Sequence, residues 1–109
     1  MNNKVSYRYA RGLFELAKDK NLLKDFLNDC QLILRYEQNI GLSDLITNPT
    51  LSKEKKLEVF METFKNHVSR KFLDFFKLLL NKGREIYLFS IAKNYIKLYN
   101  QLNSIIVAE

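Results

Sequence analysis

The chain has 109 residues, of which 47% are hydrophobic and 28% charged. This composition is typical of one globular domain whose hydrophobic core is stable without disulfide bonds or metal ions. No apolar run approaches the ~20 residues that a transmembrane helix needs, and a lone cysteine, Cys30, excludes an intramolecular disulfide framework. The formal net charge of +6 suits a nucleic acid, an acidic membrane surface, an acidic partner or simple solubility.

A scarcity of turn residues indicates an all-α fold. The chain holds one proline and three glycines, too few for the repeated hairpins of an all-β protein. Apolar periodicity predicts helices, in chain order, over residues 4–20, 22–39, 42–47, 53–65, 68–82 and 85–104. Short connections between them predict a compact bundle of five long helices and one short one.

Local signals mark several helix ends. Asn21 is a left-handed stop for the first helix, and Gly83 is the glycine that follows the fifth. The residue before Pro49 disfavours the α conformation, so the short helix ends there. Ser52 is the expected N-cap of the fourth helix.

The tail, residues 105–109, reads Ile-Ile-Val-Ala-Glu and favours an extended strand because it is β-branched. Residues 1–104 are therefore predicted to form a helical domain. A lone terminal strand has no partner to pair with, so we expect it to lead into a further domain that this chain does not contain.

The helix over 68–82 carries more apolar surface than a surface helix needs. Its apolar residues span about 220°, against a stripe somewhat wider than ~100°. Either it is the central helix of the bundle, or part of its apolar arc meets another protein. Phe75, Leu78 and Leu79 lie toward one edge of that arc.

The helix over 4–20 has a similar surplus, with an apolar arc of about 160°. Its small residues Ala10, Gly12 and Ala17 would allow another helix to approach closely, and Gly12 otherwise costs ~1 kcal/mol in a helix interior. Together the two helices are predicted to frame a groove for an amphipathic helix.

No constellation for catalysis is evident. His67 and Cys30 are the only pair that suggests an enzyme, and that hypothesis requires them to converge in space. No metal-ligand spacing and no phosphate-binding glycine loop occurs, since the glycines are isolated. We expect a non-catalytic protein with no cofactor and no metal.

Basic residues cluster at 53–56, 70–71 and 82–84. Solvated helix faces explain most of this charge, and a basic helical module that binds nucleic acid or another protein is the alternative. The aromatic residues fall on apolar faces rather than among the basic ones, which disfavours nucleic acid.

Four segments resemble the delta subunit of the F-type ATP synthase, the relative of the mitochondrial oligomycin-sensitivity-conferring protein. Residues 9–17 (YARGLFELA) resemble its opening helix motif, and residues 48–56 (NPTLSKEKK) its loop into helix four. Residues 75–84 (FFKLLLNKGR) are similar to the end of its helix five, and residues 107–109 to the strand entering its second domain.

The resemblance implies a six-helix N-terminal domain that sits on the catalytic head at the cytoplasmic face of the bacterial inner membrane, without inserting into it. It implies that helices one and five hold the N-terminal helix of an alpha subunit. The C-terminal domain would grip the stalk of b subunits, and the assembly would act as a stator. The groove is carried over onto Tyr9, Ala10, Leu13, Phe14, Phe75, Leu78 and Leu79.

Overall fold

Helices make up nearly all of the described chain, which in this computed structural model comprises the backbone of residues 4–107 and the side chains of residues 4–103. The elements are α1 (Lys4–Lys20), α2 (Leu23–Arg35), α3 (Ile40–Thr47), α4 (Lys53–Phe64), α5 (Arg70–Lys82), the 3-10 helix η1 (Glu85–Tyr87) and α6 (Leu88–Val107). The described residues contain no strand, so the predicted all-α bundle with one short helix is confirmed.

Two helices end in the same backbone motif, as predicted. Gly83 follows α5 with a φ of 68°, and Asn21 follows α1 with a φ of 61°. After α5, the N–H of Gly83 donates to the Leu80 carbonyl and the N–H of Arg84 to the Leu79 carbonyl. These are the two bonds of a Schellman motif, which satisfies carbonyls that the helix leaves free.

The predicted start of α4 is also confirmed. Ser52 is the N-cap, and its side-chain oxygen accepts from the Lys55 N–H at 3.0 Å. Asn48, immediately before Pro49, is extended, and α3 ends at Thr47 as expected.

Helix α2 is shorter than predicted, because it ends at Arg35 rather than near Asn39. Its last turn tightens, with the Tyr36 N–H donating to the Ile33 carbonyl at 3.0 Å. Asn39 instead caps the next helix, since its side chain accepts from the Leu42 N–H at 3.0 Å. A side chain used as an N-cap favours the extended backbone that Asn39 adopts, so α2 cannot include Asn39 and α3 starts at Ile40, two residues earlier than predicted.

Helix α5 begins at Arg70, two residues later than predicted, because a distant carboxylate holds its first turn. Asp29 of α2 accepts from the Ser69 N–H at 3.2 Å and from the Ser69 hydroxyl at 2.6 Å. Burial raises the pKa of the Asp29 carboxyl above its ordinary value. The last predicted helix starts with the three-residue 3-10 segment η1 before it becomes α-helical at Leu88.

The predicted strand at the C-terminus is wrong for residues 105–107. Helix α6 continues to Val107, and residues 108–109 lie outside the described residues. Extending an existing helix adds one hydrogen bond per residue, whereas a lone strand has no neighbour to supply one. The modest helix penalty of β-branched residues does not outweigh that gain.

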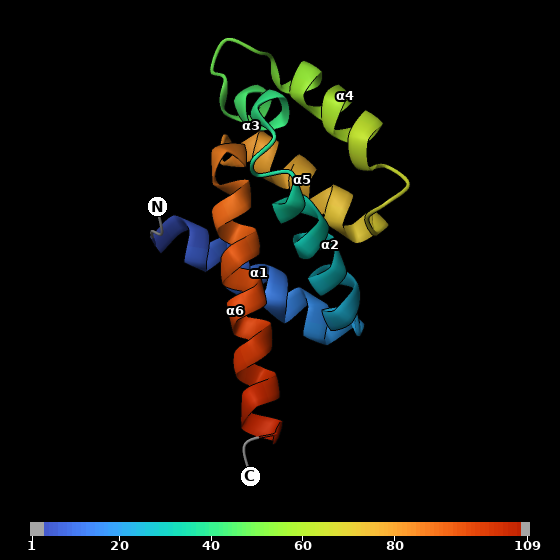
Figure 1. Cartoon of the computed structure of the whole chain (residues 1–109), viewed down its shortest axis with the longest axis vertical. Coiled ribbons are helices and arrows are strands. Elements are labelled where there is room, and N and C mark those ends of the chain that lie inside the picture. The colour runs from blue at the N-terminus through green and yellow to red at the C-terminus, as the bar shows by residue number, and fades with distance from the viewer. Residues whose placement is uncertain (1–3, 108–109) are drawn as a thin grey trace.

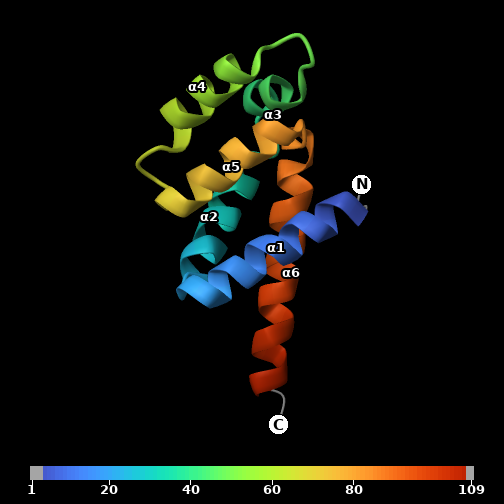
Figure 2. The ribbon, with the colours of Figure 1, turned by 180° about the vertical axis from the view of Figure 1, so that it is seen from behind.

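The helices form two groups, α1 with α2 and α6, and α3 with α4 and η1, and α5 lies between them (Figure 1). Helices α1 and α2 both pack against α6, while α4 packs against α5 and η1 contacts α3. In both views α5 lies between α4 and α2 (Figure 2). The C-terminal part of α6 projects beyond the other helices, which accounts for the long axis of 50 Å against 28 and 24 Å.

Candidate partner-binding groove

The apolar face of α1 is mostly covered by α6. Ala10 and Leu13 are 0% and 2% exposed, and α1 packs chiefly against α6. Phe14 is nearly buried, with its ring edge against Tyr95 at a centroid distance of 5.8 Å. Of the predicted groove residues on this helix, only Tyr9 is half-buried.

Helix α5 is the central helix of the bundle, which explains most of its wide apolar arc. Six of its apolar residues are buried, including Leu79 at 0% and Phe75 at 8% exposure. Leu78 differs, because 43% of its surface is exposed. Burial inside the bundle therefore accounts for the whole apolar arc of α5 except the edge that carries Leu78.

A run of aromatic rings links the two helices. Phe14 of α1 contacts Tyr95 of α6, which contacts Phe26 of α2 at 6.3 Å. Phe26 contacts Phe72 of α5 at 6.0 Å, and Phe72 contacts Phe75 at 6.0 Å. Phe14 of α1 and Phe75 of α5 are thus joined through rings of α6 and α2.

The sequence interpretation overlooked Tyr95, Phe26 and Phe72 as the link between α1 and α5. Tyr95 is fully buried, and its hydroxyl donates to the Leu23 carbonyl at 2.7 Å. Burial raises the pKa of this phenol. Each ring lies on the apolar face of its own helix, but no local pattern indicates that the rings meet.

Gly12 does not serve close packing within the chain, and its role in the close approach of a partner helix stays a prediction. It is exposed, and a Cβ added there would meet no atom within 4 Å. Ala10 and Ala17 are both 0% exposed, so these two alanines occupy the buried face of α1 instead.

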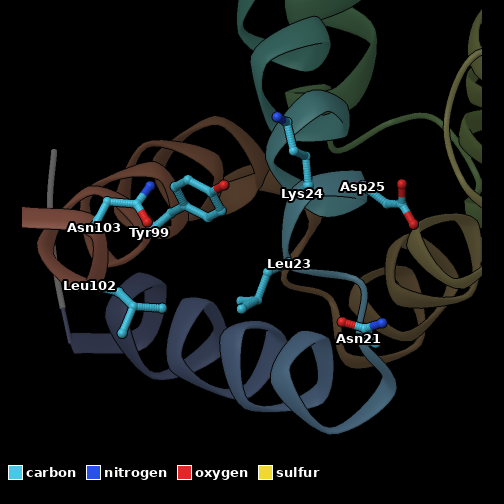
Figure 3. Close-up of a pocket in the computed structure, with 7 residues that line it drawn as sticks. All are labelled: Asn21, Leu23, Lys24, Asp25, Tyr99, Leu102 and Asn103. Carbon is cyan, nitrogen blue, oxygen red and sulfur yellow. The ribbon is translucent and has the colours of Figure 1, made fainter. Parts of the chain in front are cut away.

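A separate cleft of about 360 Å³ lies where the end of α1 and the start of α2 meet α6. Tyr99 and Leu102 of α6 face Leu23 of α2 across its opening, and Asp25 points away (Figure 3). No predicted groove residue lines it.

The catalytic hypothesis finds little support. Cys30 is fully buried, and burial raises its thiol pKa well above the ordinary value, the opposite of an activated nucleophile. His67 is exposed in the connection between α4 and α5. Among the described residues, no group of three or more His, Cys, Asp or Glu side chains is placed to hold a metal ion.

The basic cluster at 53–56 is largely engaged within the protein. The ammonium of Lys56 pairs with Glu85 at 2.6 Å, and that of Lys55 with Glu58 at 3.6 Å. Lys53 donates to the Asn81 carbonyl at 3.3 Å. Cations held in this way contribute less to an electrostatic nucleic-acid surface.

Within the part of the chain that the structure covers, no helix is both long enough and apolar enough to cross a bilayer.

Comparison with known proteins identifies relatives along most of the sequence. The model of the family described as ATP synthase delta (OSCP) subunit matches residues 5–109. The ATP synthase subunit delta of Desulforudis audaxviator is 35% identical over 106 residues, which cover 96% of this chain. A subunit delta from Clostridium botulinum strain Loch Maree is 32% identical over 102 residues, and the chloroplastic one of Cyanidium caldarium is 30% identical over 102.

The chain spans only part of these relatives. The matched segment covers 58% of the Desulforudis protein, 57% of the Clostridium protein and 54% of the Cyanidium protein.

Proposed function

This chain belongs to the family of ATP synthase delta (OSCP) subunits, and from that membership we propose that it is a peripheral-stalk adaptor of an F-type ATP synthase. It is non-catalytic, and it resists rotation of the catalytic head while protons drive the rotor. The observation that carries this role is the family match over residues 5–109.

The partner of this domain is the N-terminal helix of an alpha subunit, held between α1 and α5. The stalk of b subunits binds a C-terminal domain, and the additional length of the relatives is enough for such a domain. The complex works at the cytoplasmic face of a bacterial inner membrane, with this subunit peripheral.

Of the proposed groove residues, Leu78 is exposed and Tyr9 half-buried, and these two are the contacts most open to a partner. Leu78 keeps 43% of its surface exposed, so covering it contributes about 1 kcal/mol. Ala10, Leu13 and Leu79 lie beneath and support these contacts, since all three are at most 2% exposed. Binding therefore depends on a few edge residues rather than on the whole apolar arc.

The test is a titration of the chain with a synthetic alpha-subunit N-terminal peptide. Leu78→Asp should weaken binding at least tenfold without unfolding the domain, because an exposed position tolerates a carboxylate that a desolvated interface does not. Tyr9→Ala should weaken it less.

Ile86→Asp is the matched control, because Ile86 is also an exposed apolar residue, at 49%, but lies on η1. An unchanged affinity in both Leu78→Asp and Tyr9→Ala would remove the groove assignment while leaving the family membership intact.

A nucleic-acid-binding role is the alternative, motivated by the net charge of +6. It predicts an affinity that falls linearly with salt on logarithmic axes. The internal pairing of Lys55 and Lys56 argues against it. Absence of a gel shift at low salt would dispose of it.

A further inference from the structure

A cleft between α4 and α5 is separate from the proposed groove. Its volume is about 380 Å³, within the range of small-molecule sites. Residues from the end of α4, the connection and the first two turns of α5 line it: Met61, Lys65, Asn66, Val68, Arg70, Leu73, Asp74 and Lys77.

The cleft carries excess positive charge. Lys65, Arg70 and Lys77 oppose a single carboxylate, Asp74, which leaves a net charge of +2. Across the described residues none of these four side chains takes part in an ion pair within 4.0 Å, whereas five other pairs form elsewhere. Cations gathered without partners create a local positive potential, and an anion bound among them relieves their repulsion.

The floor of the cleft is apolar. Met61 and Val68 are half-buried, and Leu73 is 9% exposed. A free phosphate ion would leave this apolar surface exposed to water. The cleft therefore favours a ligand that has an apolar group as well as a negative charge. Asp74 repels an anion unless the ligand also brings hydrogen-bond donors, because an ionised carboxylate only accepts. A lipid tail brings no such donors.

We propose that the α4–α5 cleft binds a nucleoside phosphate. Lys65, Arg70 and Lys77 neutralise its phosphates, with the Arg70 guanidinium providing paired donors. The ring body covers Met61 and Leu73, and the ribose hydroxyls or exocyclic amine donate to Asp74.

The cleft adjoins the proposed groove on α5, because Leu78 follows Lys77 and lies one turn beyond Asp74 on the same side of the helix. The two proposals are tested separately, since the nucleotide titration uses the chain without any partner peptide, and failure of one leaves the other standing.

The experiment follows backbone amide shifts of the 109-residue chain by NMR during titration with ADP, pyrophosphate and adenosine. Pyrophosphate supplies the charge alone and adenosine the ring alone. ADP should bind at least tenfold more tightly than either, with shifts confined to residues 61–77, and its affinity should fall when salt is raised.

Arg70→Gln and Lys77→Gln should each weaken ADP binding by 3- to 10-fold. Both residues are exposed, so the substitutions leave the fold intact. Lys97→Gln, an equal charge change on the exposed face of α6, should have no effect. Equal affinity for pyrophosphate and ADP, shifts spread over the whole surface, or an equal loss in Lys97→Gln would each overturn the proposal.

Discussion

The ion pair between Lys56 and Glu85 is the most demanding electrostatic feature of the fold. The Lys56 ammonium donates to Glu85 Oε2 at 2.6 Å, and the two side chains are 4% and 10% exposed. The pair joins the first turn of α4 to η1 across 29 positions of sequence. The other carboxylate oxygen, Oε1, is buried and accepts no hydrogen bond from the described residues.

Lys56→Met removes the cation and leaves a buried carboxylate uncompensated. The expected loss is about 3–5 kcal/mol, the usual result of breaking a buried pair. A domain of this size has a total stability of about 5–15 kcal/mol, so the variant should be marginal. The double variant Lys56→Met/Glu85→Leu removes both desolvation penalties and the unsatisfied oxygen. It should be as stable as the parent, or more stable by up to about 4 kcal/mol.

Urea unfolding followed by far-ultraviolet circular dichroism measures both effects. With a slope of about 2 kcal/mol per molar urea, Lys56→Met should lower the midpoint by roughly 1.5–2.5 M. Lys93→Met is the control, since it breaks a pair of similar length, 2.9 Å, whose side chains are 58% and 31% exposed. That loss should stay below about 1 kcal/mol. If the two single variants lose equal stability, Lys56 and Glu85 are solvated and the reasoning is wrong.

Three further predictions concern individual positions. Gly12→Ala should raise the stability by about 0.5–1 kcal/mol, because Gly12 is exposed within a helix and has open space at its Cβ. Gly83→Ala should lower the stability by about 1–2 kcal/mol, because the backbone φ of 68° disfavours a side chain. Thermal melts compare the two variants, and a stabilised Gly83→Ala would contradict the backbone argument. The Asp29 carboxyl has a raised pKa in the folded state, so the folded state binds its proton more tightly and the stability due to this group falls as pH rises from 3.8 through the raised value. Asp29→Asn should abolish that fall in urea titrations between acid and neutral pH, and an unchanged pH profile would show that another group is responsible. The buried Cys30 thiol should react with an aromatic disulfide reagent only at the rate of unfolding, so that labelling accelerates with urea; rapid labelling in buffer would contradict its burial.

Local chemistry in the sequence was sufficient to predict the helices and several of their ends. Ser52, Asn21 and Gly83 act on backbone groups only a few residues away, so their roles follow from composition and spacing. The errors in helix ends came from a local competition at Asn39 and from the distant contact of Asp29 with Ser69 at the start of α5. Asn39 is the clearest example, because it caps α3 rather than extending α2.

The candidate groove was predictable only in part. Periodicity indicated that α1 and α5 carry wide apolar arcs, yet it did not distinguish Leu79, which is fully buried, from Leu78, which is 43% exposed. Which part of an arc is covered depends on the neighbouring helices, and helix periodicity contains no information about them.

The sequence by itself determined the helical class, most helix boundaries and the family likeness, because these depend on interactions between near neighbours. Tertiary structure alone decided the contacts between distant positions. Asp29 holds Ser69 across 40 residues, and Tyr95 bonds to Leu23 across 72. Such contacts form only after the helices pack, since burial makes an unmatched polar group costly and so selects its partner.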